Sequence, residues 1–467
     1  NILAYNKSDL CICMTKLFGS SGVRGLVNID LTPTLVCNVA SAVATYSKAK
    51  KAVVAKDTRV SGDVIESALI SGLISCGVDV LLAGVVPTPV CAYAVKKFGA
   101  DVGFMITASH NPPQYNGIKV FNNDCISYTD ADQEAVEKIV AQKSFLFSNW
   151  KKLGKVTSIY AEDAYLEMLL GAFFLKKQWR IIVDPGCGAT FKLAPQLLKA
   201  LGCEVTTINS QPDGFFPARK SEPTSESLQI LSKIVKALKA DLGVAFDGDG
   251  DRVAFVDEKG SFVDLDSSLS AYSAYVLKHN VAATIVTNVE ASMSIETLAR
   301  RYNGDVNRTP VGDIYISESV KQLGAVFGGE PCGAWVHPQM HLCPDGPLSA
   351  ALLLLALEKE NKSLSEFVSE VPKYITARKN FQCSNEIKHE LIIKLGHTFK
   401  AAFSGYTDFS MVDGIRLALN NGWFLVRASG TEPLIRLTVE GESEKAAKDI
   451  TEKATALILK QIEAQTK

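Results

Sequence analysis

Short apolar runs alternate along the chain with turn residues and stretches of helical periodicity. Residues 53–55, 181–183 and 284–286 are three such runs, and each leads into a polar turn. A helical pattern follows each run, and then a second apolar run that opens with glycine. These glycines are Gly77, Gly202 and Gly304. The alternation of strand-like and helix-like periods predicts an α/β fold.

A third strand-like run completes each unit. Residues 100–103 (ADVG) and 240–243 (ADLG) are nearly identical, and residues 324–326 occupy the matching place. Six residues beyond the glycine of each run stands a polar residue in a loop rich in glycine or proline. These residues are Ser109, Asp249 and Glu330. The chain therefore contains three related units, and their polar loops are expected at the strand ends where open α/β sheets bind ligands.

The C-terminal part has a different pattern. Residues 413–419, 423–427 and 434–440 are predicted strands, and an amphipathic helix is predicted from about residue 442 to 459. This indicates a small α+β domain, joined by a linker near residues 371–379. The predicted fold is three related α/β domains plus a smaller C-terminal α+β domain. Its expected divisions are an N-terminal extension (1–13), α/β domains at 14–150, 151–255 and 256–370, and the α+β domain at 371–467.

Composition narrows the possible functions. The chain has 467 residues, enough for about three or four domains, and its 47% apolar and 21% charged content is typical of a globular protein. A net charge of −1 gives no electrostatic reason to expect nucleic acid or a membrane surface as partner. The longest aliphatic run, residues 350–357, is too short to span a bilayer. Eleven scattered cysteines without a Cys-x-x-Cys spacing favour reduced thiols and a cytoplasmic protein.

Residues 247–252 (DGDGDR) place three carboxylates between glycines directly after an apolar strand. Like charges this close at a strand end are costly without a cation, so Asp247, Asp249 and Asp251 are candidate metal ligands. An EF-hand is the competing interpretation, but the later ligands of that motif are missing. Mg²⁺ suits a site with few carboxylates plus a phosphate oxygen better than Ca²⁺ does.

Residues 107–113 (TASHNPP) form a polar loop that two prolines stiffen. A serine on a rigid loop can accept a phosphoryl group when a metal and anion-binding groups lie nearby, although a loop serine is more often a turn or cap residue. His110 is a candidate base or simply a residue that fixes the loop.

Three further segments carry candidate binding residues. Residues 427–433 (RASGTEP) predict a phosphate site made by an arginine, hydroxyls and free backbone N–H groups, and a plain hairpin turn remains the alternative. Glu330 in residues 328–333 (GGEPCG) suits sugar hydroxyls. Arg24 and Lys119 can neutralise phosphate or assist proton transfer, or they are ordinary surface charges.

Taken together, these segments resemble the α-D-phosphohexomutase superfamily, which includes phosphoglucomutases, phosphomannomutases and phosphoglucosamine mutases. The resemblance runs from about Met14 to the C-terminal helix, and the sequence looks similar to archaeal members. Four motifs stand in family order: TASHNP, DGDGDR, GEPCG and RASGTEP. The family fold has three related α/β domains and a smaller fourth domain around a central cleft, which agrees with the repeat.

The resemblance implies a role for each candidate. Ser109 would be the phosphorylated serine and would hold Mg²⁺ together with the three aspartates. Arg24, Lys119 and His110 would complete the catalytic set. The implied substrate-binding residues are Arg252, Thr309, Gly312, Glu330, Cys332, Arg427, Ser429, Gly430 and Thr431.

The reaction implied is the exchange of hexose 1-phosphate and 6-phosphate, with hexose 1,6-bisphosphate as activator and intermediate. Many members have serine and histidine where this chain has Cys332 and Ala334. A thiol is a weaker hydrogen-bond partner than a hydroxyl, so the sugar is the open question. The archaeal likeness favours glucosamine phosphate, and the alternatives are mannose or glucose phosphate, a sugar phosphatase, or a non-catalytic sugar-phosphate sensor. The expected state is a monomer or homodimer with a small sugar phosphate as partner.

Overall fold

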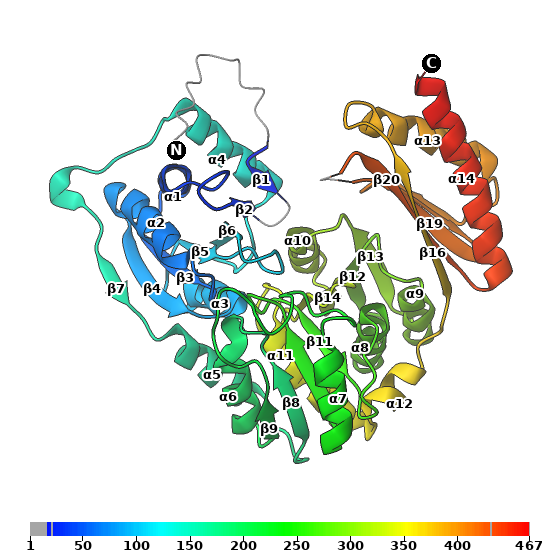
Figure 1. The fold of residues 1–467 in the computed structure, drawn as a ribbon, viewed down its shortest axis with the longest axis horizontal. Coiled ribbons are helices and arrows are strands. Elements are labelled where there is room, and N and C mark those ends of the chain that lie inside the picture. Colours follow the sequence, from blue (N-terminus) through cyan, green and yellow to red (C-terminus); the bar gives the residue numbers. More distant parts are fainter. Residues whose placement is uncertain (1–15, 20–21, 430–431, 467) are drawn as a thin grey trace.

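The computed structural model describes residues 16–19, 22–429 and 432–466 of the chain (Figure 1). Three α/β domains and a C-terminal domain with an antiparallel sheet follow one another around an arc, from domain I (blue to cyan) to domain IV (orange to red). The predicted fold class is therefore confirmed. The expected extension at residues 1–13 lies outside the described residues.

Domain I has a seven-stranded sheet in the order β1-β2-β6-β5-β3-β4-β7. Its strands are β1 (Phe18–Gly19), β2 (Gly22–Leu26), β3 (Lys51–Lys56), β4 (Asp79–Val85), β5 (Val102–Ile106), β6 (Tyr115–Asn122) and β7 (Val156–Ser158). Its helices are α1 (Pro33–Ser47), α2 (Gly62–Ser75), α3 (Thr88–Lys97), α4 (Asp130–Gln142) and the 3₁₀ helix η1 (Trp150–Lys152). Thr129 and Asp132 form a reciprocal cap that starts α4. Strand β7 comes after residue 150, the expected end of this domain, yet it pairs with β4.

Domains II and III each have a four-stranded sheet, in the orders β11-β10-β8-β9 and β13-β12-β14-β15. Domain II contains α5 (Ala161–Ala172), β8 (Arg180–Asp184), η2 (Ala189–Phe191), α6 (Leu193–Ala200), β9 (Glu204–Thr207), α7 (Gln229–Leu238), β10 (Leu242–Phe246) and β11 (Val253–Val256). Domain III contains α8 (Leu265–His279), β12 (Thr284–Asn288), α9 (Ser294–Ala299), η3 (Arg300–Tyr302), β13 (Asp305–Thr309), α10 (Asp313–Leu323), β14 (Phe327–Gly329), β15 (Trp335–Val336), α11 (Gly346–Glu360) and α12 (Leu364–Ser369).

The predicted repeat is present in all three sheets. A central strand (β3, β8 or β12) has a parallel neighbour on each side, namely β4, β9 or β13 and β5, β10 or β14. An antiparallel strand (β6, β11 or β15) then follows the third strand. The loops after β5, β10 and β14 are therefore equivalent in topology, as the sequence predicts.

Domains II and III share one hydrophobic core. Phe246 and Phe255 of domain II belong to the same buried cluster as Tyr272, Phe327 and Trp335 of domain III. The Trp335 ring stacks on Tyr272, with ring centroids 5.0 Å apart. This shared core keeps the loop after β10 next to the loop after β14.

Domain IV has an antiparallel sheet in the order β16-β20-β19-β18-β17. It contains β16 (Ile375–Gln382), α13 (Lys388–Ala402), β17 (Asp408–Ser410), β18 (Ile415–Leu419), β19 (Gly422–Ala428), β20 (Leu434–Gly441) and α14 (Glu444–Thr466). The predicted linker at 371–379 is wrong from Ile375 onward, because β16 pairs with β20 along its whole length. Most of β16 is exposed, so it lacks the apolar alternation that reveals a strand.

No helix in the described part of the chain is both long and apolar enough to cross a membrane.

Candidate active site

The serine loop follows β5 and places Ser109 in a buried, strained position. Ser109 is 1% exposed, and its φ of 49° lies in the left-handed region that residues other than glycine seldom adopt. Its N–H donates to Thr107 Oγ1 at 2.8 Å, and Thr107 Oγ1 donates to Asp57 at 2.7 Å. Strain of this kind persists where the surroundings over-determine the backbone, which is common at reacting residues.

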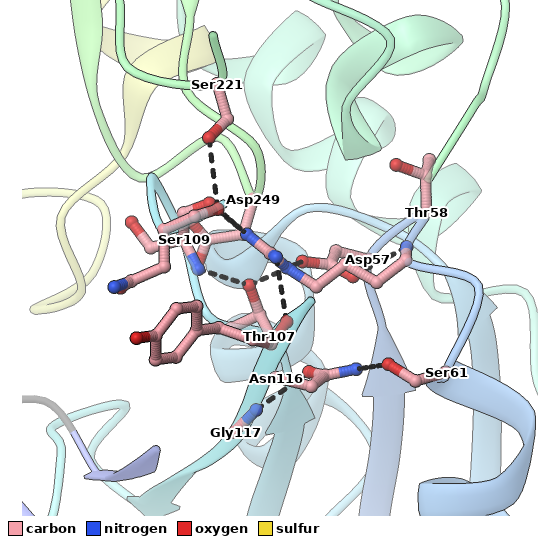
Figure 2. Close-up of polar contacts among 12 residues, drawn as sticks. Asp57, Thr58, Ser61, Thr107, Ser109, Asn116, Gly117, Ser221 and Asp249 are labelled. Carbon is pink, nitrogen blue, oxygen red and sulfur yellow. Dashed lines mark hydrogen bonds and ion pairs between the residues drawn. The ribbon is translucent and has the colours of Figure 1, made fainter. Parts of the chain in front are cut away.

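Figure 2 shows Asp57, Thr107 and Ser109 together, and Arg59 supplies most of the constraint on the serine loop. Its Nε donates to Asp57 at 3.0 Å, and its Nη2 donates to the carbonyl of Ser109 at 2.8 Å. The remaining donors bind the carbonyls of Asn111, Pro112 and Tyr115. One buried guanidinium therefore ties four carbonyls of the serine loop to domain I. Burial raises the pKa of Asp57 to about 6, although the neighbouring Arg59 acts to lower it.

The acidic loop follows β10 and meets the serine loop across the boundary between domains I and II. Ser109 Oγ donates to Asp247 Oδ2 at 2.6 Å. A Cβ on Gly248 would lie 2.5 Å from the Ser109 carbonyl oxygen, so only glycine permits this approach. Ligand atoms of Asp247, Asp249 and Asp251 all lie within 4.8 Å of one another, and these side chains are buried.

The donor set of this triad fits a hard cation. Asp249 Oδ1 and Asp251 Oδ1 are buried without a hydrogen-bond partner among the described residues. Burial and the two neighbouring aspartates raise the pKa of Asp247 well above its ordinary value. Close carboxylates with oxygens that accept no hydrogen bond are the ligands that a divalent ion binds. The triad is thus an acidic cluster able to bind a metal.

Lys119 on β6 is the cation closest to the triad. Its Nζ lies 2.8 Å from Asp249 Oδ2 and 2.5 Å from Asp251 Oδ2, and the residue is 2% exposed. Burial acts to lower the pKa of Lys119, but the two carboxylates raise it above its ordinary value. Lys119 is therefore protonated and holds one oxygen of each carboxylate. The opposite oxygens accept no hydrogen bond from the described residues, although Arg252 Nε lies 4.0 Å from Asp251 Oδ1.

The other predicted catalytic residues lie around Ser109. His110 Nδ1 is 3.4 Å from Ser109 Oγ, and burial together with Arg252 and Arg24 lowers the pKa of His110 to about 3. Its imidazole is therefore neutral at physiological pH. Arg24 Nη1 donates to Asn111 at 3.1 Å, and its Nε has no partner in the described residues.

The loop after β14 presents Glu330 beside the acidic loop. Glu330 Oε1 accepts hydrogen bonds from Asn288 Nδ2 and from the N–H of Gly312. Its Oε2 lies 4.0 Å from Cys332 Sγ, and burial raises the pKa of Cys332 to about 12, so the thiol stays protonated. Thr309 is buried, and its hydroxyl donates to the adjacent Pro310 carbonyl.

The predicted phosphate loop lies between β19 and β20 of domain IV. Arg427 is engaged by two carboxylates: Asp413, whose Oδ2 is 2.8 Å from Nη2, and Glu290 of domain III. Lys388 of α13 is 5% exposed, and its Nζ donates to the Ser429 carbonyl at 2.5 Å and the Glu432 carbonyl at 3.4 Å. Gly430 and Thr431 lie outside the described residues.

A cavity of about 380 Å³ brings the four domains together. Of the predicted site residues it is lined by Arg24, Asp251, Arg252, Gly312, Glu330 and Cys332. The other predicted site residues that the structure describes do not line it, namely Ser109, His110, Lys119, Asp247, Asp249, Thr309, Arg427 and Ser429. The sequence analysis missed other lining residues, namely Asp266, Asn288, Glu290, Asp313, Arg378, Arg436 and Thr438. Their chain positions carry no motif, and only the fold brings them together.

The domain sequences identify the family. Residues 15–147, 163–260 and 264–374 match "Phosphoglucomutase/phosphomannomutase, alpha/beta/alpha" domains I, II and III, and residues 367–457 match the C-terminal domain of the same family. The chain belongs to the phosphoglucomutase/phosphomannomutase family. As a phosphohexomutase it is an enzyme, an isomerase that acts as an intramolecular phosphotransferase.

Relatives with this family fold cover nearly the whole chain. A protein of Pyrococcus abyssi named "Probable phosphoglucosamine mutase" is 40% identical over 445 residues, 95% of this chain and 98% of the relative. One of Methanothermobacter thermautotrophicus with the same name is 41% identical over 441 residues, 94% of this chain and 96% of the relative. The crystal structure of a phosphoglucomutase/phosphomannomutase family protein from Burkholderia thailandensis superposes with a TM-score of 0.87 at 28% identity, covering 96% of this chain and 97% of that one.

Proposed function

We propose that this phosphohexomutase is a phosphoglucosamine mutase, which interconverts glucosamine 1-phosphate and glucosamine 6-phosphate through a phosphoserine at Ser109. The observation that carries the proposal is the placement of a strained, buried Ser109 hydroxyl 2.6 Å from Asp247 of the acidic triad. The choice of sugar is supported by the name of the archaeal relatives at about 40% identity.

Ser109 Oγ would carry a phosphoryl group and pass it to the free hydroxyl of a bound hexose monophosphate. This gives hexose 1,6-bisphosphate and leaves the serine free. After the bisphosphate has reversed its orientation in the cleft, its other phosphoryl group is transferred to Ser109. Both half-reactions thus use one serine, and the residues around it bind, orient and neutralise the phosphoryl oxygens.

Asp247, Asp249, Asp251 and an oxygen on phosphorylated Ser109 are the proposed ligands of Mg²⁺. When bound, Mg²⁺ supplies positive charge to the phosphoryl oxygens as they transfer. Lys119 and Arg24 add fixed positive charge beside the same atoms. His110, which is neutral, lies with Nδ1 3.4 Å from Ser109 Oγ, where it would orient the serine hydroxyl during transfer.

The sugar and the phosphate that is not transferred are assigned to domains III and IV. Glu330 would accept hydrogen bonds from sugar hydroxyls, with Cys332 and Gly312 beside it. Arg252 lines the same cavity. The distal phosphate would be held by Arg427, Ser429, Gly430 and Thr431. Because this phosphate is attached to either of two positions on the sugar, its binding should depend on charge more than on shape.

The decisive test is turnover of glucosamine 1-phosphate, glucose 1-phosphate and mannose 1-phosphate with Mg²⁺, following 6-phosphate and free phosphate. The wild type should isomerise glucosamine 1-phosphate fastest. The rate of isomerisation should be lower by about 10³-fold or more in Ser109→Ala. In Ser144→Ala, at an exposed serine of the same domain, the rate should match the wild type.

Each result that differs from these expectations would overturn a different part of the proposal. Release of free phosphate without the isomer would identify a phosphatase. No turnover of any of the three sugar phosphates would identify a sensor. Faster turnover of mannose or glucose phosphate would overturn the sugar assignment and keep the reaction. Activity that survives complete removal of divalent ions would overturn the Mg²⁺ assignment.

We also infer a cytoplasmic location, supported by the nine described cysteines, which are all free thiols. The expectation of a monomer or homodimer, with no nucleic acid or membrane partner, stays a prediction. Light scattering of the purified protein would measure its oligomeric state.

A further inference from the structure

A second cavity, of about 620 Å³, lies between domains III and IV and has no part in the proposed reaction. Domain III contributes α9, η3 and β13 to its wall, and domain IV contributes β17 and the β18–β19 hairpin. Its volume falls within the range of small-molecule sites in proteins.

The feature that marks this cavity is Arg416 on β18. The residue is 5% exposed, yet its guanidinium makes no hydrogen bond among the described residues, and its Nε is buried without a partner. It lies 4.8 Å from the centre of the Trp423 ring. Its nearest carboxylate, Asp408, is 3.8 Å from Nη1 and is itself 66% exposed. The donors of buried arginines almost always have hydrogen-bond partners, so a buried arginine without one that lines a cavity points to a missing acceptor such as an anion.

The neighbouring carboxylates do not accept hydrogen bonds from Arg416. Arg308 occupies both carboxylate oxygens of Glu296, at 2.7 and 2.9 Å. The Glu442 carboxylate, on the cavity wall, belongs to an exposed residue. Burial and Arg308 lower the pKa of Arg416 to about 9, so the side chain stays charged. The carboxylates of Glu296, Asp408 and Glu440 act to raise that pKa, but the N–H donors of Arg416 still lack an acceptor, which an anion in the cavity would supply.

Domain III supplies a second free guanidinium on the same wall. Arg300 of η3 is exposed, lines the cavity, and forms no ion pair within the described residues. Hydroxyl groups line the same cavity: Thr297 Oγ1 and Tyr374 Oη lie 3.0 Å apart, and Ser410 is also on the wall. Two guanidinium forks and several hydroxyls match a ligand that bears both an oxyanion and hydroxyl groups.

We propose that this cavity binds a small hydroxylated oxyanion, a phosphate ester or a carboxylate, with Arg416 as the buried anchor and Arg300 as the exposed partner. The site is separate from the catalytic cleft and does not depend on the proposed function. Because the arginines stand on different domains, an anion held by both ties domain IV to domain III.

Binding is measured as the shift in melting temperature with inorganic phosphate or tartrate, at constant ionic strength set by chloride. The titrations use the Arg427→Gln protein, in which the phosphate grip of the catalytic cleft is weakened. At least one anion should raise the melting temperature. Adding Arg300→Gln should weaken the apparent affinity about tenfold, the effect of one charged hydrogen bond. Adding Arg301→Gln should change nothing, because Arg301 makes the same charge change on η3 but lines a different cavity.

The proposal fails if neither anion shifts the melting temperature, or if the Arg300 and Arg301 variants titrate alike. The stronger of phosphate and tartrate identifies the ligand class. A crystal soaked in tungstate, an electron-dense phosphate mimic, supplies an independent readout that needs no variant. Density between Arg416 and Arg300 supports the site, and ordered water alone at Arg416 overturns it.

Discussion

Arg59 should control catalysis through the position of the serine loop, and Arg59→Lys tests this. Arginine makes five side-chain hydrogen bonds here, one to Asp57 and four to loop carbonyls. Lysine has three donors, so at least two bonds are lost. At about 1.5 kcal/mol for each bond to a charged group, the variant should lose about 3 kcal/mol of stability.

The effect on turnover should exceed what this stability loss implies. Arg59 holds the carbonyl of Ser109 itself, and a displacement of about 1 Å at a reacting atom costs on the order of 10²-fold in rate. We expect kcat to fall about 10²-fold. The KM for glucosamine 1-phosphate should stay within about threefold, because Glu330 and Arg427 lie on other domains.

Urea unfolding and steady-state kinetics on the same samples separate the two effects. The control is Arg180→Lys, because the Arg180 side chain is half exposed and its Nε lies 3.9 Å from Asp241 Oδ2. Stability and kcat should both be nearly unchanged in this variant. If Arg59→Lys lost stability but kept kcat within about threefold of the wild type, the serine loop would not depend on Arg59 and the reasoning would be refuted.

Three further substitutions test contacts around the cleft. Glu290→Gln removes a carboxylate that competes with substrate for Arg427, so the KM for glucosamine 1-phosphate should fall about threefold in steady-state assays. Lys388→Met removes the ammonium that holds the Ser429 and Glu432 carbonyls, so KM should rise about tenfold while kcat changes less. Burial raises the pKa of the Asp266 carboxyl to about 7, so the folded state binds this proton more tightly than the unfolded state does. The free energy of unfolding should therefore be highest at low pH and fall as the pH rises from about 4 through 7. Urea unfolding between pH 4 and 8 should therefore show a decline in wild-type stability that Asp266→Asn lacks.

Each of these three predictions has a result that would contradict it, and the two predictions on KM also have a control variant. Glu442→Gln, at another exposed carboxylate, should leave KM unchanged, and a higher KM in Glu290→Gln would contradict competition for Arg427. Lys394→Met, on the exposed side of α13, should be neutral. A fall in kcat for Lys388→Met without a change in KM would contradict a role in phosphate grip. For Asp266→Asn, a stability difference that is constant with pH would contradict the pKa argument.

The sequence predicts the α/β repeat well because each strand of the repeat is a buried apolar run with a glycine or polar turn beside it. It draws attention to Ser109 and the three aspartates because their loops follow such strands directly, and the catalytic and metal-binding roles of these residues stay predictions. It fails at β16, whose exposed residues carry no apolar alternation, and at α13, which has no motif. It also misses the partners of the site residues. Arg59 reaches the carbonyls of residues about fifty positions away, and a single sequence contains no trace of such contacts.

Each of the three α/β domains has an arginine that donates hydrogen bonds to backbone carbonyls near a strand end. Carbonyl groups at the ends of parallel strands need donors, and in each α/β domain a buried or half-buried arginine supplies them. Arg59 does so in domain I. In domain II, Arg219 donates to the Phe246 carbonyl at 2.7 Å, directly before the acidic loop, and to the Asp184 side chain at 3.0 Å. In domain III, Arg308 donates to the Asn288 carbonyl at 2.8 Å.

In domains I and II this support explains how two equivalent loops carry different chemistry, whereas Arg308 in domain III supports the loop after β12 and not the loop of Glu330. In domains I and II the arginine fixes the backbone of the loop or of the strand end before it through donors that no loop side chain has to supply. The side chains of these loops are then free to differ, as a serine and an aspartate do at Ser109 and Asp249. A change in a loop side chain should therefore alter the reaction with little effect on the fold, whereas loss of the supporting arginine should damage both.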